Sequence, residues 1–252
     1  MASGRFAHVL GDRSMASPPH AFSEEEKAAL YRAIRERRDI RRFRSDPIPA
    51  ATLARILDAA HHAPSVGFMQ PWDFILIRES ATRQRVHAAF RTANAEALEH
   101  FTGERQQQYA TLKLEGILES ALNLCVTCDR QRFGPVVLGR TCQLDMDLYS
   151  TVCAVQNLWL AARVEGVGVG WVSILHAEEV AQILALPPHV VPIAYLCLGY
   201  VDEFPSAPEL QTAGWLPRLP LADVVRYETW PSPPSTDWQE LRRELSNSQF
   251  PG

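Results

Sequence analysis

The segment DLYSTVCAVQNLWLAARVE, residues 147–165, constrains the fold more than any other part of the chain. Its pattern predicts one helix, which Asp147 caps and Gly166 ends. Apolar residues occupy nearly every side of this helix, with only small or amide polar groups among them. A helix that is apolar all round must be buried. We therefore expect it at the centre of the domain or packed against a second subunit.

Helices and strands alternate along the rest of the chain. A capping box at Ser23 predicts a first helix, and a second is expected from about Ala51 to His62. The stretch from Ser80 to about Ser120 predicts a long helical region with a break at Gly103. Strands are expected at WDFILIRE (72–79) and ALNLCVTCD (121–129), both buried, and at VGVGWVSIL (167–175) and VVPIAYLCLGYVD (190–202), with a short helix at AEEVAQILA (177–185). This interleaving predicts a mixed α/β domain around one sheet.

Composition excludes several classes of function. The 252 residues carry a formal net charge of -4, with a pI near 6.1, which argues against a general nucleic-acid binder. No apolar run approaches the roughly 20 residues that span a bilayer, so no membrane segment is expected. Five cysteines cannot all pair, which indicates reduced thiols and a cytoplasmic protein. Cys125 and Cys128 have CxxC spacing but lie in an apolar run, so we expect core packing and no metal site.

A dense arginine cluster, ERRDIRRFRSDPI, follows the first helix. Five arginines fall within the eight residues 37–44, with Asp39 among them. Guanidinium groups bind phosphate bidentately, so several that point to one place would form an anion site. The alternatives are a solvated charged face and, for Arg37 and Arg38, a favourable position at the negative end of a helix dipole. For Asp39, the residues alone favour a salt bridge with Arg37 or Arg42 at the end of the helix.

Three glycines, Gly166, Gly168 and Gly170, do not form a dinucleotide fingerprint. They follow a helix and enter a strand, whereas the fingerprint follows a strand and opens a helix. Glycine within a strand indicates either close approach of the backbone to a flat ligand or tight packing against a helix. The sequence leaves both explanations open.

Several ordered motifs point in one direction. RRDIR, APSVGFMQPW, TGERQQQY, LKLEGI, VVLGRT, the helix-to-strand segment 146–174 and PELQTAGWLPRLPL lie between about Ala21 and Trp230. Together they resemble the nitroreductase superfamily of FMN proteins, and most closely its flavin-destroying branch. The resemblance implies an α/β (α+β) fold with a central mixed or antiparallel sheet flanked by helices. It also implies a homodimer with FMN at the subunit interface.

The resemblance assigns roles to residues at matching positions. Asp39 corresponds to a general acid/base beside the flavin. Ser173 corresponds to a hydrogen-bond donor near the flavin ring, with a simple binding hydroxyl as the alternative. The expected FMN site combines phosphate, ribityl and neighbouring contacts from Arg37, Arg38, Asp39, Ile40, Arg41 and Arg218, a loop along the flavin with Pro64, Ser65 and Gly67, the covering residue Leu114, and the ring-facing residues Gly170 and Ser173.

Three departures from ordinary nitroreductases follow the flavin-destroying branch. They are Asp39 where Ser or Thr is usual, Phe68 where Asn is frequent, and a polar insertion at about 92–118. The implied reaction consumes reduced FMN and O2 and yields 5,6-dimethylbenzimidazole, the lower ligand of vitamin B12, and erythrose 4-phosphate. FMN is then a substrate, and a separate NAD(P)H-dependent flavin reductase must supply it in reduced form. The alternatives are an NAD(P)H-dependent FMN nitroreductase or flavin reductase and, in another class, a non-catalytic flavin-binding protein.

The chain divides into three expected regions. Residues 1–20 lack a continuous apolar segment and are expected to form a loose N-terminal extension. Residues 21–230 form the FMN-binding domain, with the insertion at about 92–118 as a lid. Residues 231–252 begin with a Pro- and Ser-rich stretch and are expected to form a C-terminal tail.

Overall fold

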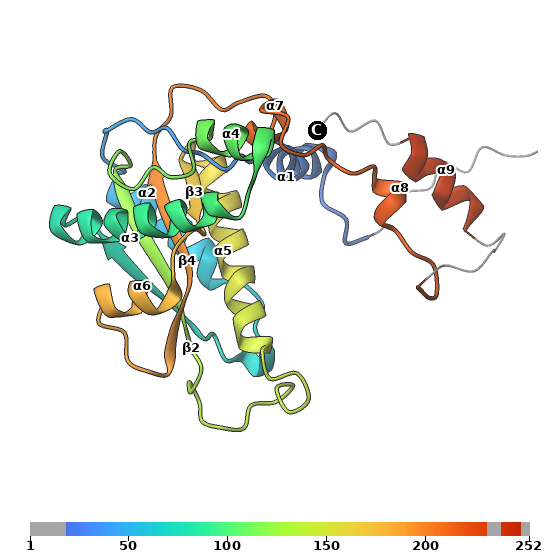
Figure 1. Cartoon of the computed structure of the whole chain (residues 1–252). Coiled ribbons are helices and arrows are strands. Elements are labelled where there is room, and N and C mark those ends of the chain that lie inside the picture. Colours follow the sequence, from blue (N-terminus) through green and yellow to red (C-terminus); the bar gives the residue numbers. More distant parts are fainter. Residues whose placement is uncertain (1–18, 231–237, 248–252) are drawn as a thin grey trace, which may run out of the picture.

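The structure, a computed structural model of the chain, describes residues 19–230 and 238–247. Its centre is one sheet of four antiparallel strands in the order β1-β2-β4-β3 (Figure 1). The strands are β1 (Trp72–Ile77), β2 (Leu122–Asp129), β3 (Gly168–Val172) and β4 (Val190–Gly199). The expected class, a sheet flanked by helices, is confirmed, and the sheet is antiparallel.

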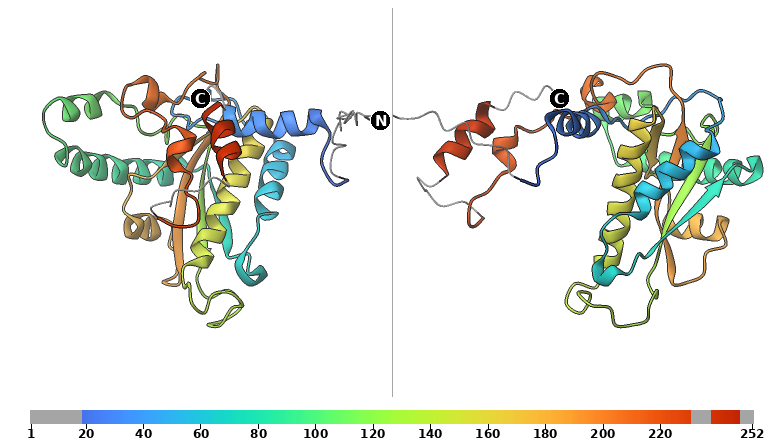
Figure 2. Two further views of the ribbon diagram at one scale, coloured as in Figure 1. Left: turned by 90° about the vertical axis from the view of Figure 1, so that its right-hand side faces the viewer. Right: turned by 180° about the vertical axis from the view of Figure 1, so that it is seen from behind.

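Helices cover both faces of the sheet (Figures 1 and 2). Successive side chains of β2 point to opposite faces, so Leu124 joins the apolar cluster with α2 and α5, whereas Cys125 joins the cluster with α3 and α6. This double cover explains why β2 is apolar and buried along nearly its whole length. The covering helices are α2 (Ala50–His61), α3 (Ser80–Glu99), α5 (Met146–Val164) and α6 (Ala177–Ile183).

The N-terminal helix α1 (Glu24–Glu36) begins at the predicted capping box. The Ser23 hydroxyl accepts a hydrogen bond from the backbone N–H of Glu26, and the Glu26 carboxylate accepts one from the backbone N–H of Ser23. The expected second helix corresponds to α2, whose apolar stripe is buried at Leu53 and Ile56. Both predictions are confirmed.

The long apolar helix α5 differs from expectation at its start. Asp145 precedes the helix, and Asp147 lies inside its first turn, where it is fully buried. Its carboxylate pairs with Arg130 at 2.9 Å and with Arg140 at 3.2 Å, so Asp147 anchors the 130–145 connection and does not cap the helix. Gly166 ends the helix with a φ of +73°, as predicted.

Only one side of α5 is covered by its own chain. Val155 and Leu158 are buried against the sheet and α2. On the other side, Tyr149 is 57% exposed, Val152 41% and Val164 72%. Packing within one domain therefore explains the apolar residues on one side of this helix. The apolar residues on the other side are free to contact a second subunit.

The expected helical region from Ser80 to Ser120 consists of two helices and an irregular connection. Helix α3 is followed by α4 (Gly103–Thr111), and Gly103 adopts a φ of +58° at the break. The chain is irregular from 112 to 121, so the prediction of helix up to Ser120 is wrong there. Strand β1 is also less buried than expected, because it lies at the edge of the sheet and its middle is partly exposed.

The C-terminal part carries three helices, α7 (Glu209–Thr212), α8 (Leu221–Val224) and α9 (Gln239–Asn247). Helices α8 and α9 pack together beside the main body (Figures 1 and 2). Most of the expected N-terminal extension lies outside the described residues, as does the expected tail except 238–247, which contains α9. Within the described ranges, no helix is long and apolar enough to cross a bilayer.

All five cysteines lie in the described part of the chain and are free. Burial raises the pKa of the Cys125 thiol to about 12 and that of the Cys128 thiol to about 11. Cys125 packs with α3 and α6, whereas Cys128 contacts Thr151 of α5 on the opposite face. The interpretation of the CxxC pair as core packing is confirmed.

Candidate active site

The arginine cluster borders a cavity of about 260 Å3, which we call the arginine cavity. One wall is the 37–41 segment, which follows α1. The other walls are the connection after α4 and the segment that contains α7, and these elements lie together at the top of Figure 1. The cavity is lined by Arg37, Arg38, Asp39, Arg41, Leu112, Lys113, Leu114, Pro208, Glu209, Leu210 and Arg218. Six of the twelve residues expected at the site are in this lining.

Asp39 is held by its own backbone and by two donors. The 39–40 segment runs along the free edge of β3, where Asp39 forms a parallel bridge with Val169. The Asp39 Oδ1 atom accepts hydrogen bonds from Arg41 Nη1 at 2.6 Å and from the backbone N–H of Trp171 at 2.9 Å. The Oδ2 atom accepts one from Arg41 Nη2 at 2.5 Å. Oδ2 therefore retains the greater capacity to bind a proton or a ligand.

The expected partners of Asp39 in a salt bridge were Arg37 or Arg42, and the observed partner is Arg41. The Arg42 guanidinium instead pairs with Glu209 at 2.8 Å. The difference arises because the chain is extended after α1, which places residues 39 and 41 on the same side. Arg41 and Arg42 thus pair with different carboxylates, Asp39 and Glu209.

Gly170 is required by the close approach of this segment. A Cβ atom at Gly170 would lie 2.0 Å from the carbonyl oxygen of Ile40. The Ile40 N–H donates to the carbonyl of Val169 at 3.0 Å, and its side chain is buried. Close approach of the Ile40 backbone therefore explains this glycine, and packing against a helix does not. The absence of a side chain at Gly170 lets the strip that carries Asp39 lie against β3.

Arg37 faces the cavity in a half-buried position. Its guanidinium carbon lies 4.7 Å from the centroid of the Trp159 ring. Burial lowers the pKa of Arg37, the Asp39 charge opposes this change, and the nearby positive charge of Arg218 adds to it. Two guanidinium groups that repel each other at one cavity form a favourable place for an anion.

Arg38 lines the cavity and also holds the backbone around it. It is 7% exposed, and its guanidinium donates to the carbonyl oxygens of Pro205 at 3.0 Å and Ser206 at 2.5 Å. It also donates to the carbonyls of Arg35 at 2.6 Å and Arg37 at 2.9 Å. These bonds fasten the end of α1 to the segment that precedes α7. Arg38 therefore adds positive charge to the cavity lining, while its N–H groups hold the backbone.

The expected loop residues Pro64, Ser65 and Gly67 lie at the other end of α5. The backbone N–H of Val66 donates to the Ser150 hydroxyl at 3.0 Å, near the start of the helix. The indole of Trp159, near its end, donates to the carbonyl of Arg38 at 3.1 Å. Nine positions of helix separate these two contacts, which corresponds to about 14 Å. One protomer therefore does not bring the loop to the arginine cavity.

The loop itself is strained. Gly67 has a φ of +52°, and the non-glycine residues Phe68 and Gln70 have φ values of 55° and 45°. Positive φ is uncommon for such residues, and strained backbone clusters at binding and catalytic sites. A side chain at Gly67 would collide with Val137 and Leu138 of the 130–145 connection.

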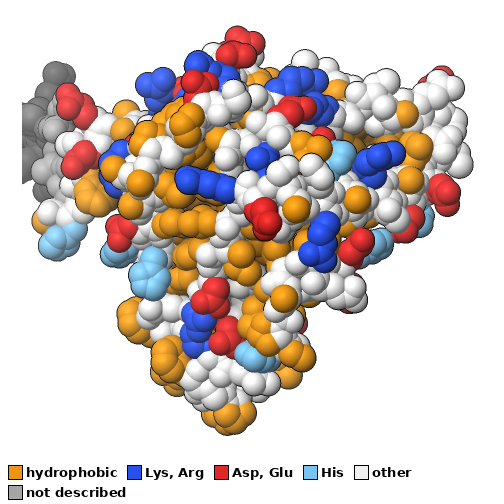
Figure 3. All heavy atoms as spheres, turned by 90° about the vertical axis from the view of Figure 1, so that its left-hand side faces the viewer, with side chains coloured by type: hydrophobic (Ala, Val, Ile, Leu, Met, Phe, Trp, Pro, Cys, Tyr) orange, Lys and Arg blue, Asp and Glu red, His pale blue; other side chains and the backbone are white. Residues whose placement is uncertain are grey.

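Apolar side chains gather around this loop. Figure 3 shows them at the lower tip of the molecule, where Figure 1 places the connection between β2 and α5. We call this group the lower apolar patch, and its members are 65–85% exposed: Phe68, Phe133, Val136, Leu138 and Leu144. Large exposed apolar side chains gathered in one region are typical of an interaction site.

Ser173 is the remaining expected catalytic residue. It follows β3 directly and is exposed. It lines a separate hollow of about 200 Å3 together with Trp171, whose backbone N–H holds Asp39. Asp39 and Ser173 thus lie along the same strand, on neighbouring hollows.

Several lining residues were not anticipated. Leu112 and Lys113 are the first two residues of LKLEGI, and Pro208, Glu209 and Leu210 belong to PELQTAGWLPRLPL. Trp159, which contacts Arg37, was not singled out because it lies among the other apolar residues of α5. The motifs signalled the segments, but only the fold shows that they meet at one cavity.

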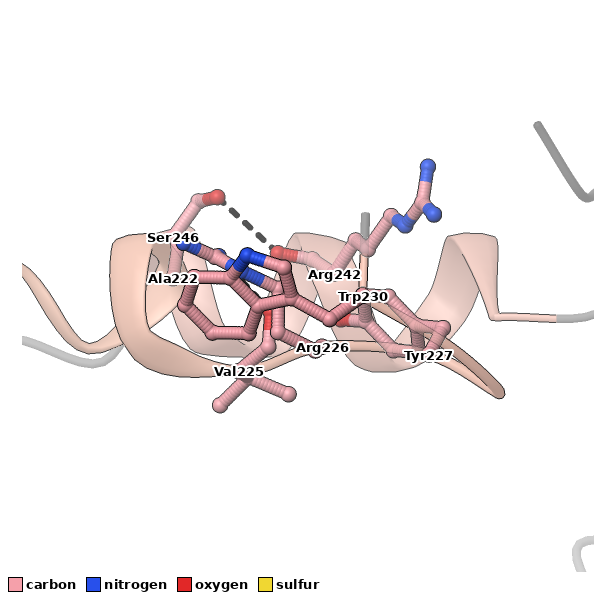
Figure 4. Close-up of a pocket in the computed structure, with 7 residues that line it drawn as sticks. All are labelled: Ala222, Val225, Arg226, Tyr227, Trp230, Arg242 and Ser246. Carbon is pink, nitrogen blue, oxygen red and sulfur yellow. Dashed lines mark hydrogen bonds between the residues drawn. The ribbon is translucent and has the colours of Figure 1, made fainter. Parts of the chain in front are cut away.

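A further hollow is also a possible site. A hollow of about 500 Å3 lies between α8 and α9 (Figure 4), and its lining includes Arg226, Trp230 and Arg242 but none of the expected residues. Within residues 19–230 and 238–247, no group of three or more His, Cys, Asp or Glu side chains is placed to hold a metal ion.

Comparisons with known proteins agree on one family. The family model described as Nitroreductase family matches residues 34–200. The 5,6-dimethylbenzimidazole synthase of Rhodospirillum rubrum is 44% identical over 190 residues, which cover 75% of this chain and 90% of that protein. The 5,6-dimethylbenzimidazole synthase of Rhodobacter capsulatus is 39% identical over 199 residues, which cover 79% of this chain and 96% of that protein.

The fold has solved counterparts. A crystal structure of oxidised iodotyrosine deiodinase bound to FMN and 3-iodo-L-tyrosine superposes with a TM-score of 0.63 at 22% sequence identity. The match covers 79% of this chain and 99% of that one. At this level of identity, the likeness shows a common fold.

Proposed function

The chain belongs to the nitroreductase family, and we propose that it fragments reduced FMN with O2 into 5,6-dimethylbenzimidazole and erythrose 4-phosphate. The observation that carries this proposal is the 44% identity to a 5,6-dimethylbenzimidazole synthase across 90% of that relative's length. The carboxylate of Asp39 in a cationic cavity supports the same reaction, because the proposed cleavage needs a group that moves protons.

The cavity residues fit the phosphate end of FMN. Arg37 and Arg218 offer two guanidinium groups at one place, and like-charge repulsion between them is relieved when a dianion binds. Leu112, Leu114 and Leu210 supply apolar walls for the part of the ligand next to the phosphate. The cavity volume of about 260 Å3 is below the roughly 300 to 1,000 Å3 of complete ligand pockets. One protomer thus fits only part of the flavin.

We propose that a second copy of the chain completes the site. The expected loop with Pro64, Ser65 and Gly67 lies at the far end of α5 from the arginine cavity in its own protomer. The exposed side of α5 and the lower apolar patch offer the apolar surface that an obligate dimer interface needs. A homodimer in which this surface is covered brings the loop of one subunit toward the cavity of its partner.

Asp39 is the proposed acid/base group. Arg41 and the Trp171 N–H fix the carboxylate, so its orientation requires no rearrangement when a ligand enters. Oδ2 accepts one hydrogen bond and Oδ1 accepts two, so we assign proton uptake and release to Oδ2. Reduced FMN supplies the reactivity toward O2 and the carbon framework of the product.

Ser173 and the lid have supporting roles. The Ser173 hydroxyl is proposed to donate a hydrogen bond to the flavin ring from the end of β3. The connection after α4 lines the cavity through Leu112 and Leu114. An apolar cover of this kind excludes water from the reacting atoms. The same cover leaves little room for a second organic substrate, so we propose that a separate NAD(P)H-dependent flavin reductase provides reduced FMN.

The fate of the flavin tests this proposal. Purified protein with one equivalent of FMN is photoreduced without oxygen and then mixed with air, and the absorbance of oxidised flavin is followed. Permanent loss of this absorbance supports fragmentation. Full recovery together with NAD(P)H consumption by a nitro compound would identify a nitroreductase. Full recovery without such consumption would identify a flavin-binding protein.

A further inference from the structure

Helix α4 and the segment after α7 meet at Trp215. The guanidinium carbon of Arg105 lies 3.7 Å from the centroid of the Trp215 ring, and Arg105 Nη2 donates to the Trp215 carbonyl at 2.7 Å. The rings of Phe101 and Tyr109 approach the same indole edge-on, with centroids at 5.3 and 6.2 Å. The indole is thus enclosed by aromatic and cationic groups of one short helical region.

The chain beyond α7 is shaped to make this contact. Gly214 ends α7 with a φ of +70°, a conformation that favours glycine. The backbone N–H of Trp215 then donates to the carbonyl of Leu210 at 2.8 Å, which turns the chain back. A second bond, from Gln108 Nε2 to the carbonyl of Ala213 at 2.7 Å, joins α4 to the same turn.

Both partners of this contact lead directly to the cavity. The chain after α4 contains Leu112 and Leu114, which line the cavity. Trp215 precedes Arg218 by three residues, a span of at most about 10 Å. Pro217 lies between them and fixes its own φ angle. The position of the Trp215 backbone therefore restricts where Arg218 can lie.

Arg218 needs such a restriction. Its positive charge contributes to lowering the pKa of both Arg37 and Arg38, so the three groups repel one another. Arg218 is also exposed and could move into solvent. A contact that fixes its backbone keeps the charge at the cavity before an anion arrives, and preorganisation of this kind raises affinity.

We propose that Arg105 and Trp215 are positioning residues that hold Arg218 at the phosphate end of the cavity. The Arg105–Trp215 pair thereby sets the selectivity for a phosphorylated flavin over an unphosphorylated one. Neither residue of the pair lines the cavity. The selectivity rests on the proposed function, in which FMN is the ligand. The packing of α4 against the Trp215 segment does not depend on the proposed function.

Equilibrium binding tests the effect on selectivity. Dissociation constants for oxidised FMN and for riboflavin are measured by quenching of flavin fluorescence. Trp215→Ala is expected to lower the preference for FMN over riboflavin by roughly tenfold, because a charge-assisted contact to phosphate is misplaced. Trp215→Phe retains an aromatic face for Arg105 and is expected to restore most of the preference.

A double-mutant cycle separates positioning from general damage. Arg218→Ala alone is expected to lower the preference by a similar factor, and Trp215→Ala in that background is expected to lower it no further. Trp230→Ala is the matched control, because Trp230 also stacks on an arginine, Arg226 at 4.4 Å, but lies away from the cavity. It is expected to leave the preference unchanged. The proposal would be overturned if Trp215→Ala weakened the binding of FMN and riboflavin equally. It would also be overturned if the effects of Trp215→Ala and Arg218→Ala on the preference were fully additive.

Hydrogen exchange in the ligand-free protein separates this inference from the proposed function. Trp215→Ala is expected to speed exchange in both 103–111 and 209–218, because each loses its partner. Unchanged exchange in either segment would overturn the inference whatever the ligand. If wild-type protein shows no preference for FMN while Trp215→Ala speeds exchange in both segments, the pairing stands, and the selectivity and the proposed function both fail.

Discussion

The Asp39 carboxylate and the Arg41 guanidinium form a bidentate ion pair, with oxygen–nitrogen distances of 2.6 and 2.5 Å. The Arg41 side chain is 11% exposed and that of Asp39 43%. The pair therefore consists of a mostly buried cation and a carboxylate that reaches the cavity. An arginine in this cluster orients the carboxylate, which explains why an acid can lie within an anion site.

Replacing Asp39 by Asn tests its role as a proton carrier. Asn keeps the shape and can still accept the Trp171 N–H, but it loses the charge and the exchangeable carboxyl proton. We expect FMN binding to remain and the rate of 5,6-dimethylbenzimidazole formation to fall by about 100-fold or more. Single-turnover product analysis measures this. Asp46→Asn is the control, because Asp46 pairs with Arg44 at 2.8 Å in the same two-residue spacing outside the cavity. Full activity in the Asp39 variant would contradict the assignment.

Arg37 and Arg42 provide a paired test of the phosphate contact. Arg37 lines the arginine cavity, whereas Arg42 is not part of the lining and pairs with Glu209. We expect Arg37→Ala to weaken FMN binding by about 10- to 100-fold and to change riboflavin binding far less. Arg42→Ala is expected to change either affinity by less than about fivefold, as for an exposed ion pair. Equal losses in the two variants, measured by fluorescence titration, would show that general charge explains binding.

The buried thiols predict a loss of stability in alkali. Burial raises the pKa of Cys125 and Cys197 to about 12, whereas a thiol in an unfolded chain has a pKa of about 8.5. Above about pH 8.5, the unfolded chain releases protons that the folded chain keeps. The free energy of unfolding therefore falls as pH rises toward about 12, by up to about 1.4 kcal/mol per pH unit for each thiol.

Urea denaturation between about pH 8 and pH 10 measures this slope. Cys125→Ala is expected to reduce the slope, and Cys142→Ala to retain it, because Cys142 is exposed. A slope that Cys125→Ala leaves as steep as in wild type would contradict the expectation.

The exposed side of α5 predicts a subunit interface. Val152→Asp places a charge on this side and is expected to shift the protein from dimer to monomer in sedimentation experiments. The monomer is also expected to bind FMN at least about tenfold more weakly, because the loop of the second subunit is missing. Leu76→Asp is the control, because Leu76 is 47% exposed on β1, compared with 41% for Val152. A monomeric wild-type protein that binds FMN tightly would contradict the shared site.

The sequence predicted local structure best where neighbouring residues determine it. The Ser23 capping box and the end of α5 at Gly166 depend on short-range hydrogen bonds and backbone conformation, and both are confirmed. Asp147 looked like a helix cap by position, but two arginines of the preceding irregular connection make it a buried ion-pair partner. Such partners depend on tertiary structure, which the local pattern does not contain.

The candidate site shows the same division. The motifs selected the segments that line the cavity. They did not separate Arg38, whose donors bind backbone carbonyls, from Arg37, which faces the cavity. They also allowed a helix packed against Gly170, where the structure has the backbone of Ile40. These differences arise from long-range packing of the 37–41 segment against β3.

The mass balance of the flavin tests the central claim most directly. Protein and FMN in equal amounts are reduced, exposed to air, and separated by chromatography, with FMN and 5,6-dimethylbenzimidazole quantified by mass spectrometry. The account predicts one 5,6-dimethylbenzimidazole for each FMN lost, no product without O2, and product formation slowed by about 100-fold or more with Asp39→Asn. Quantitative recovery of intact FMN after aeration would contradict it.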